Sequence, residues 1–550
     1  MQVPAQTRSA GVERQRQNGG GLPYKWIVAI VIIFGIFMSI LDATIVNVAI
    51  PRLQTAFGAS LSSVQWVATA YTLAQGVATP LTPFFSERLG IKRFYIFGLA
   101  AFTAGSALCG LAWSLPILIF FRILQAMGGA FLLPLSITLL YSEFPPEERG
   151  TAIGALGIPI LIAPALGPTV GGYIVTYLGW QLIFYINLPI GIIGILMALL
   201  LLRDYPVERR SRFDIPGFIF SALGLASLLY GLSSAGNDGW GSTTVQGFLA
   251  LGIICLAIFV AIELITARSG RQPLLDLRVF GNGPFTTSNI ASVLVAFALF
   301  GGLFLVPVYL QILRGLSAYQ AGLILLPQAL GSMVATLVGG RLVDRIGAKP
   351  VVFTGLIILG FALWRFSYLS LYTPYLLFQI LLILRGLGLG LSSQPLTVSS
   401  LWEIKPRDLP QATSVSSVTR FVAGSLGVAV LSTTVQTQTK VHYSHLAEQV
   451  TASSPAGQLI TRLEAFFVAR GADVTSAMHA AVQVVAGQLH RQAYMLAMDD
   501  AFLLTLVFAI LALIMVFFVR GGRRAGTRRR AQGQTGAEEA KMRDEATPAV

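Results

Sequence analysis

Long apolar runs recur along almost the whole chain, and they limit its possible folds more than any other feature. A transmembrane helix needs about 20 apolar residues to cross the hydrocarbon core of a bilayer, and about fourteen runs reach that length, the first centred near Val31 and the last near Phe508. The runs are continuous, whereas the strands of a membrane barrel alternate apolar and polar residues. Charged residues make up only 11% of the chain, against about a quarter in soluble domains. The sequence therefore predicts an all-α polytopic membrane protein with about 14 transmembrane helices.

The basic residues are distributed unevenly between the two sides of these runs. The net charge is +14. With the N-terminus inside, 28 of the 38 Lys and Arg residues fall in cytoplasmic tails and loops, six fall outside, and four fall within runs. Such an excess on the inside is typical of cytoplasmic loops. We therefore expect a multi-pass protein of the cell membrane with both termini in the cytoplasm. Its basic residues are expected to contact anionic lipid and not nucleic acid.

The cysteines and histidines give no metal or catalytic pattern. Cys109 and Cys255 lie singly in different runs, without ligand spacing or a neighbouring base, and are interpreted as packing residues. All four histidines lie in the segment 436–497, between the last two runs. Solvated side chains are a simpler interpretation of these histidines than a metal site. We therefore expect no metal and no cofactor.

The segment 436–497 is predicted to be a long outer loop. Its stretches 457–470 and 475–489 have apolar faces at helical spacing. This spacing predicts helices that lie on the membrane surface or over the outer mouth of the protein. The loop is also the extramembrane feature on which an outer adaptor protein is expected, if one binds.

Two short patterns occur twice in the chain. An acid, an arginine, one further residue and a glycine occur at 87–90 and again at 344–347, each in a predicted tight cytoplasmic turn. A lone arginine, Arg122 or Arg385, lies early in an outside-to-inside run and is followed by a proline in both places. These repeats predict two six-helix halves with a substrate site between them, which move by rocking against each other. The predicted parts are an N-tail 1–25, a first half 26–202, an inserted helix pair 213–267, a second half 284–519 and a basic C-tail 520–550.

Several motifs follow one another in the order found in one transporter family. They lie at 41–51, 65–73, 122–129, 167–172 and 180–191. This set resembles the fourteen-helix drug:proton antiporters of the major facilitator superfamily, a branch of multidrug-resistance efflux pumps, over about residues 26–519. The resemblance implies the major facilitator fold, export driven by the proton gradient without a cofactor, and neighbouring positions for the first and fourth helices. The chain departs from the family at Glu87, where aspartate is usual, and at Pro83, where glycine is usual.

One carboxylate, Asp42, lies inside the first apolar run. A charge at that depth costs at least a few kcal/mol and usually faces a cavity or a partner. At 1.5 Å per residue, Asp42 and Arg122 lie about 12 Å and about 9 Å from the outer ends of their helices, and so at matching depth. Desolvation and a nearby guanidinium shift the pKa of a carboxylate in opposite directions, which suits a proton carrier. A static buried ion pair that fixes helix packing is the alternative.

The other candidates form two groups, each with a structural alternative. The predicted substrate-cavity residues could instead form interhelical hydrogen bonds or an aromatic belt at the membrane interface; they are Asn47, Trp66, Tyr71, Gln125 and Arg385. The predicted gating residues come from the repeated turn motif and the fifth helix, where close helix packing is the alternative role of the glycines; they are Glu87, Arg88, Gly90, Gly154, Gly167, Pro168, Gly171, Gly172, Asp344, Arg345 and Gly347.

The predicted function is proton-coupled export of amphipathic drugs or toxic small molecules by alternating access. A transporter of the same fold dedicated to one metabolite, siderophore, amino acid or lipid precursor is the alternative. An enzyme or receptor is not predicted, because the chain has no ATP-binding loop, metal-binding helix or nucleophile elbow and its cytoplasmic loops are short. Because Asp42 is the one deep carboxylate, we expect neutral, monocationic or zwitterionic substrates and not dications.

Overall fold

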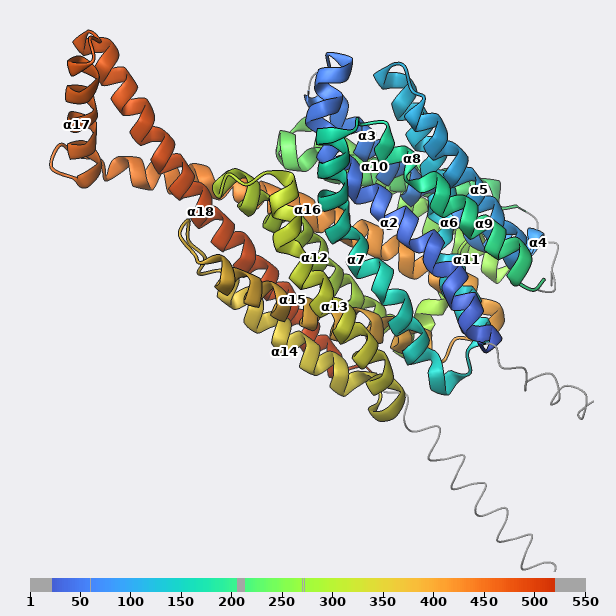
Figure 1. Cartoon of the computed structure of the whole chain (residues 1–550). Coiled ribbons are helices and arrows are strands. Elements are labelled where there is room, and N and C mark those ends of the chain that lie inside the picture. Colours follow the sequence, from blue (N-terminus) through green and yellow to red (C-terminus); the bar gives the residue numbers. More distant parts are fainter. Residues whose placement is uncertain (1–21, 60, 205–212, 270, 272, 520–550) are drawn as a thin grey trace, which may run out of the picture.

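The computed structural model of the chain describes residues 22–59, 61–204, 213–269, 271 and 273–519 (Figure 1). Within these residues the secondary structure is helical and contains no strand, as the sequence predicts. Most of the predicted N-tail 1–25, the basic loop 205–212 and the C-tail 520–550 lie outside the described residues.

The first half contains six helical segments. Their helices are α2 (Tyr24–Phe57), α3 (Leu61–Ala78) with its continuations η1 (Thr79–Leu81) and α4 (Thr82–Leu89), α5 (Ile91–Gly110), α6 (Leu115–Glu143), η2 (Pro146–Glu148) with α7 (Arg149–Tyr177), and α8 (Leu182–Tyr185) with α9 (Asn187–Leu201). The inserted pair follows as α10 (Ile215–Asp238) and α11 (Thr243–Arg268), and the short η3 (Leu277–Gly281) leads into the second half.

The second half repeats this plan with longer final helices. It consists of α12 (Gly283–Val308) with the π-helical turn η4 (Tyr309–Leu313), α13 (Ala318–Ile346), α14 (Ala348–Phe366), α15 (Tyr375–Leu401), η5 (Pro406–Asp408) with α16 (Leu409–Glu448), α17 (Pro455–Ala469) and α18 (Val474–Val516). We call the end of the bundle at which α2 begins and α18 ends the terminal end, and the opposite end the hairpin end.

Thirteen helices of the described part are long and apolar enough to cross a membrane. The predicted crossing near Ala74 is not among them, because α3 carries Gln65 and Gln75 among its apolar residues and gives way to η1 and α4 at Pro80 and Pro83. The three pieces follow one another along the chain, and α3 packs against both α6 and α10. α3 runs alongside these helices within the bundle (Figure 1).

The two predicted tight turns at the terminal end have the same backbone geometry. Gly90 between α4 and α5 has φ of 84°, and Gly347 between α13 and α14 has φ of 89°. Residues with a Cβ rarely adopt this region, so both turns require glycine. The repeated sequence pattern therefore corresponds to a repeated structure.

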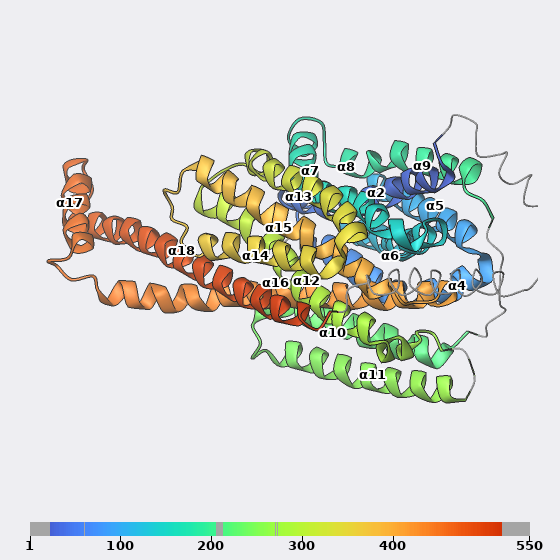
Figure 2. The ribbon, with the colours of Figure 1, turned by 90° about the horizontal axis from the view of Figure 1, so that it is seen from below.

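The two helices predicted within the outer loop 436–497 are confirmed as α17 and the first part of α18, but most of the remaining segment is also helical because α16 continues to Glu448 and α18 begins at Val474. α16 and α18 are 40 and 43 residues long, about twice the length that crosses a bilayer. Their far ends project from the bundle as a hairpin, and α17 packs against α18 at its tip (Figures 1 and 2). The stretch 475–489 does not lie over the mouth, because Ala477, Ala481 and Val485 on its apolar face are buried within the hairpin.

Two helices join the halves along their length. α7 packs against α2 of the first half and α13 of the second, and α10 of the inserted pair packs against α3 and α16. α11 covers the outer side of α10 (Figure 2). The inserted pair is thus a structural bridge and not a peripheral addition.

Candidate functional site

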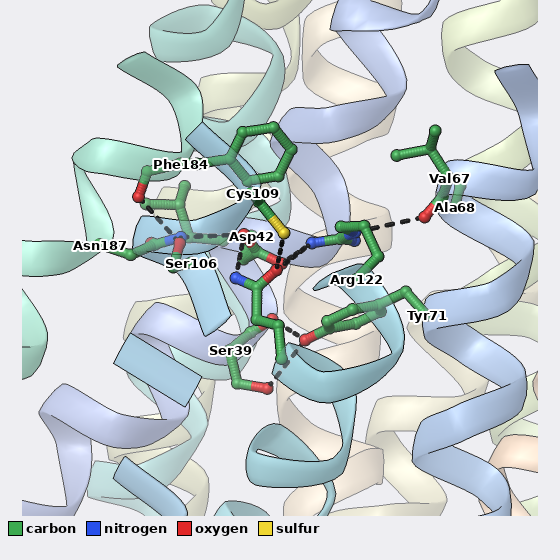
Figure 3. A network of polar contacts seen from close by, with 12 residues as sticks. Ser39, Asp42, Val67, Ala68, Tyr71, Ser106, Cys109, Arg122, Phe184 and Asn187 are labelled. Atoms are coloured by element: carbon green, nitrogen blue, oxygen red, sulfur yellow. Dashed lines mark hydrogen bonds and ion pairs between the residues drawn. The ribbon is translucent and has the colours of Figure 1, made fainter. Parts of the chain in front are cut away.

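Asp42 lies at the centre of a fully buried polar network in the first half (Figure 3). Arg122 Nη1 on α6 donates to Asp42 Oδ2 at 2.5 Å. Two amides donate to the other carboxylate oxygen, Oδ1: Gln125 Nε2 at 2.9 Å and Asn187 Nδ2 at 2.8 Å. Three donors from α6 and α9 therefore converge on the carboxylate of α2.

A second layer connects this network to α5. Asn187 Nδ2 also donates to Ser106 Oγ at 3.0 Å, and Ser106 Oγ donates to the carbonyl of Phe184 at 2.8 Å. Cys109 Sγ donates to Gln125 Oε1 at 3.5 Å. Four helices of the first half therefore meet at one carboxylate, so a change in its charge alters the hydrogen bonds of all four.

Arg122 is held from three further directions. Its Nη1 donates to Gln125 Oε1 at 2.8 Å and its Nε donates to the carbonyl of Val67 at 3.2 Å. Its Cζ lies 3.9 Å from the centre of the Tyr71 ring, a cation–π contact. The predicted pairing of Asp42 with Arg122 is thus present in the structure, and the pair is electrically balanced within its own half.

Polar side chains connect the ion pair to a cavity. Gln75 Nε2 donates to Tyr71 Oη at 3.0 Å, and Tyr71 Oη donates to the carbonyl of Ser39 at 3.3 Å. Gln75 and Ser39 both line the cavity, whereas Asp42 is fully buried. The tyrosine therefore lies between the cavity wall and the guanidinium that holds Asp42.

The cavity lies between the two halves, where the repeats predict a substrate site. Its volume is about 260 Å³, and its walls come from α2, α3, α6 and α7 of the first half and α12, α13, α15 and α16 of the second. Most of its lining is apolar, with amides such as Gln328 and Gln394 among the polar groups. Arg420 is the one charged side chain among the described residues that line it.

The structure places the five predicted cavity residues outside the cavity lining. Tyr71 and Gln125 belong to the Asp42 network described above. Arg385 is fully buried behind Gln328. Asn47 is exposed, and Trp66 is 38% exposed and stacks on Tyr230 of α10 at 5.6 Å between ring centres.

Asp344 connects the two halves at the terminal end. Its carboxylate accepts hydrogen bonds from the backbone N–H groups of Gly150 and Thr151, both at 2.8 Å, and from Thr151 Oγ1 at 2.5 Å. These groups form the N-terminus of α7, where a helix carries partial positive charge. Arg345 beside it is exposed. In the corresponding turn of the first half, Arg88 lies over the Phe84 ring at 5.8 Å, and Glu87 also has a contact.

Further contacts close the terminal end around Asp344. Ser414 Oγ donates to the carbonyl of Thr79 at 2.9 Å, and the hydroxyls of Thr138 and Thr413 lie 3.3 Å apart. These contacts join α16 of the second half to η1 and α6 of the first. Together with Asp344 they describe a conformation in which the halves touch at this end.

The glycines of α7 lie where neighbouring helices approach most closely. A Cβ on Gly167 would lie 2.3 Å from Thr44 Oγ1, and a Cβ on Gly171 would lie 2.6 Å from Ile45 Cγ1, both on α2. On the other side of α7, a Cβ on Gly154 would lie 2.9 Å from a backbone oxygen of α13, and one on Gly172 would lie 3.3 Å from the backbone of α13. Pro168 lies inside the same helix. At these glycines the backbone of α7 therefore packs directly against α2 of the first half and α13 of the second.

Sequence reasoning missed several polar residues of the site. Asn187, Ser106, Ser39 and Gln75 contact the Asp42 network or the cavity, and all four are buried. The available signal was a polar side chain within or beside an apolar run, which in a membrane-spanning helix usually faces the protein interior.

Comparison with known proteins identifies the family. Residues 32–428 match the model of the Major Facilitator Superfamily. The chain belongs to this superfamily. The multidrug transporter protein MdtP of Bacillus subtilis is 33% identical to it over 401 residues, or 73% of each chain. The riboflavin transporter RibZ of Clostridioides difficile is 35% identical over 413 residues, or 74% of this chain and 88% of that one.

Solved structures agree on the fold. A structure of the proton:xylose symporter XylE superimposes with a TM-score of 0.55 and covers 90% of this chain and 96% of that chain. Its 14% sequence identity shows the fold alone. The chain is therefore a multi-pass membrane transporter of the major facilitator superfamily with drug-efflux relatives, as its motifs predict, and not an enzyme.

Proposed function

We propose that the protein exports small amphipathic molecules in exchange for protons. The observation that carries this proposal is the fully buried carboxylate of Asp42, which is joined to the cavity wall through Arg122, Tyr71 and Gln75. Buried ionisable groups in membrane-spanning helices usually belong to proton or substrate pathways. The names of relatives such as MdtP also favour export of drugs.

The coupling step follows from the hydrogen bonds of Asp42. A proton that binds an oxygen of Asp42 removes its negative charge, so the charge-assisted bond from Arg122 and the amide bonds from Gln125 and Asn187 weaken. Asp42 then holds Arg122 less tightly, and the contact that joins α2, α6 and α9 weakens. When the proton leaves on the other side of the membrane, the network forms again.

Alternating access also requires the terminal end to open. The hydrogen bonds from α7 to Asp344 must break when the halves rock apart at that end, so this carboxylate stabilises the closed state. The close packing of α7 on α2 lets a shift of α2 at Asp42 reach Asp344 through α7. We therefore assign gating to Asp344 and to the α7 glycines.

A transporter dedicated to one metabolite remains a second candidate. It is favoured by the relative named a riboflavin transporter, which is 35% identical to this chain. The two candidates share the same proton step and differ in how many substrates the cavity accepts. A transport profile across unrelated dyes and vitamins distinguishes them, because a dedicated transporter moves one compound class and a drug exporter moves several.

The test of the proposed function is dye transport into inside-out vesicles under an imposed proton gradient. Asp42→Asn keeps the shape of the side chain and removes its titration, so we expect binding of dye without gradient-driven transport. Glu403→Gln is the matched control, because it removes an exposed carboxylate at the terminal end outside the network. Undiminished coupled transport by Asp42→Asn would overturn the assignment of the proton carrier.

A further inference from the structure

The second half carries positive charge beside the cavity without a negative partner. Arg420 lines the cavity from α16. Its Nε donates to the carbonyl of Ser416 at 3.2 Å and its Nη1 donates to Thr397 Oγ1 at 3.3 Å. These are its hydrogen bonds within the part of the chain that the structure describes, and neither partner is a carboxylate. A guanidinium has five N–H donors, so Arg420 has donors to spare for a ligand.

Arg385 adds a second cation behind the cavity wall. It is fully buried, its Nη1 donates to Gln328 Oε1 at 2.8 Å, and its Nη2 donates to the carbonyls of Ala298 and Leu299 at 3.2 and 3.3 Å. Its Nε has no hydrogen-bond partner among the described residues. Gln328 lines the cavity, so Arg385 lies one side chain away from it.

The corresponding arginine of the first half is balanced. Arg122 forms an ion pair with Asp42, and the ion pairs of the described residues include neither Arg385 nor Arg420. No acidic side chain lines the cavity among those residues. By its distance along α16, Arg420 lies about 16 Å from the start of that helix, near the middle of a hydrocarbon core about 30 Å thick. A charge at this depth is costly unless it is paired.

We propose that the transported molecules are amphipathic organic anions whose acidic group binds Arg420. A carboxylate, sulfonate or phenolate would pair with the free guanidinium donors, a geometry for which arginine is well suited. The apolar body would contact the apolar wall around Ile40, Val295 and Phe421. This inference rests on the proposed export function and narrows its substrates. It differs from the expectation of neutral, monocationic or zwitterionic substrates, which was drawn from Asp42 alone.

The charge of the substrate decides how membrane potential drives export. When one monovalent anion leaves and n protons enter, n + 1 positive charges move inward. When a monocation leaves, only n − 1 charges move. An inside-negative potential favours every net movement of positive charge inward. Export of an anion is therefore accelerated by an inside-negative potential at every proton stoichiometry.

Binding to the purified full-length protein tests the inference without requiring transport. The probes are 1-naphthoate, 1-naphthylmethanol and 1-naphthylmethylammonium, which share one apolar body and differ in charge. We expect the anion to bind most tightly. Arg420→Gln should weaken the affinity for the anion about tenfold or more, because a charge-assisted bond is lost. The affinity for the alcohol should change by less than about twofold. Retained alcohol binding shows that this variant is folded.

Two further variants separate charge from structure. Arg420→Lys keeps the charge and should bind the anion more tightly than Arg420→Gln. Arg365→Gln removes a guanidinium at the end of α14, beside Trp364 and away from the cavity, and should leave all three probes unchanged. The inference is overturned if the wild type does not bind the anion, if the ammonium binds most tightly, or if Arg420→Gln and Arg420→Lys bind the anion equally.

The proposed function and this inference fail in different ways. If Asp42→Asn leaves coupled dye transport intact while Arg420→Gln abolishes anion binding, the proton carrier is wrong and the substrate class stands. If Asp42→Asn abolishes coupled transport while Arg420→Gln leaves anion binding unchanged, the proton carrier stands and the substrate class is wrong.

Discussion

The contact of Asp344 with α7 allows one prediction to be worked out in numbers. Asp344→Ala removes three hydrogen bonds that join the halves, two from backbone N–H groups at 2.8 Å and one from Thr151 Oγ1. Hydrogen bonds to charged groups contribute about 1.5–3 kcal/mol each when buried. Asp344 is only half-buried and water can replace part of the loss, so we expect the closed terminal end to lose about 2–3 kcal/mol in total. The closed-to-open ratio should fall about 30- to 150-fold.

The distance between the halves at the terminal end measures this equilibrium. Spin labels at the exposed positions Glu147 and Arg341 report that distance by electron–electron double resonance. Cys109 and Cys255 are replaced by serine in every sample, so the labels react only at the chosen sites. We expect a dominant short distance in the parent protein and a large population at longer distance in Asp344→Ala.

Two controls make the result decisive. Asp344→Asn keeps an acceptor oxygen and loses the charge that faces the N-terminus of α7, so its open population should be intermediate. Glu403→Ala removes an exposed acid at the same end and should leave the distances unchanged. If Asp344→Ala shows the same distance distribution as the parent protein, the carboxylate does not hold the terminal end closed.

Two other substitutions test the packing and the network. Gly167→Val adds a side chain where a Cβ alone would lie 2.3 Å from a hydroxyl of α2. Overpacking should lower the free energy of unfolding by about 1–3 kcal/mol and reduce transport, as measured by thermal unfolding and vesicle uptake. An unchanged melting temperature would refute the close approach. Asn187→Leu removes the amide that donates to both Asp42 and Ser106, so gradient-driven transport should fall while dye binding is retained. Unchanged coupled transport would show that this amide does not support the Asp42 network.

The fold was predictable because the apolar runs carry its main constraint. Their length sets the helices, and the repeated pattern with Gly90 and Gly347 sets the two matching turns. The hairpin was not predictable in the same way. Helical periodicity at 475–489 predicts an apolar face but does not show what covers that face. In the structure, Ala477 and Ala481 on this face are buried within the hairpin.

The ion pair of the candidate site was predictable, and most of its surroundings were not. Equal depth along the two helices, together with the neighbouring positions that the family resemblance implies for them, was enough to pair Asp42 with Arg122. Asn187 joins them only because α8 ends just before it and α9 begins beside α2, which depends on tertiary packing. Trp66 and Tyr71 are both predicted cavity residues, but they are five residues apart on α3. At about 100° per residue they lie on different faces of the helix.

The central claim is that Asp42 carries the exchanged proton, and the most direct test counts protons released when substrate binds. Because substrate and proton are linked through one conformational equilibrium, adding a saturating transported dye to purified protein in weak buffer should release up to about one proton per molecule, seen with a pH indicator. The account predicts this release in the wild type and in Glu403→Gln, and its loss in Asp42→Asn. Equal proton release from Asp42→Asn and the wild type would contradict it.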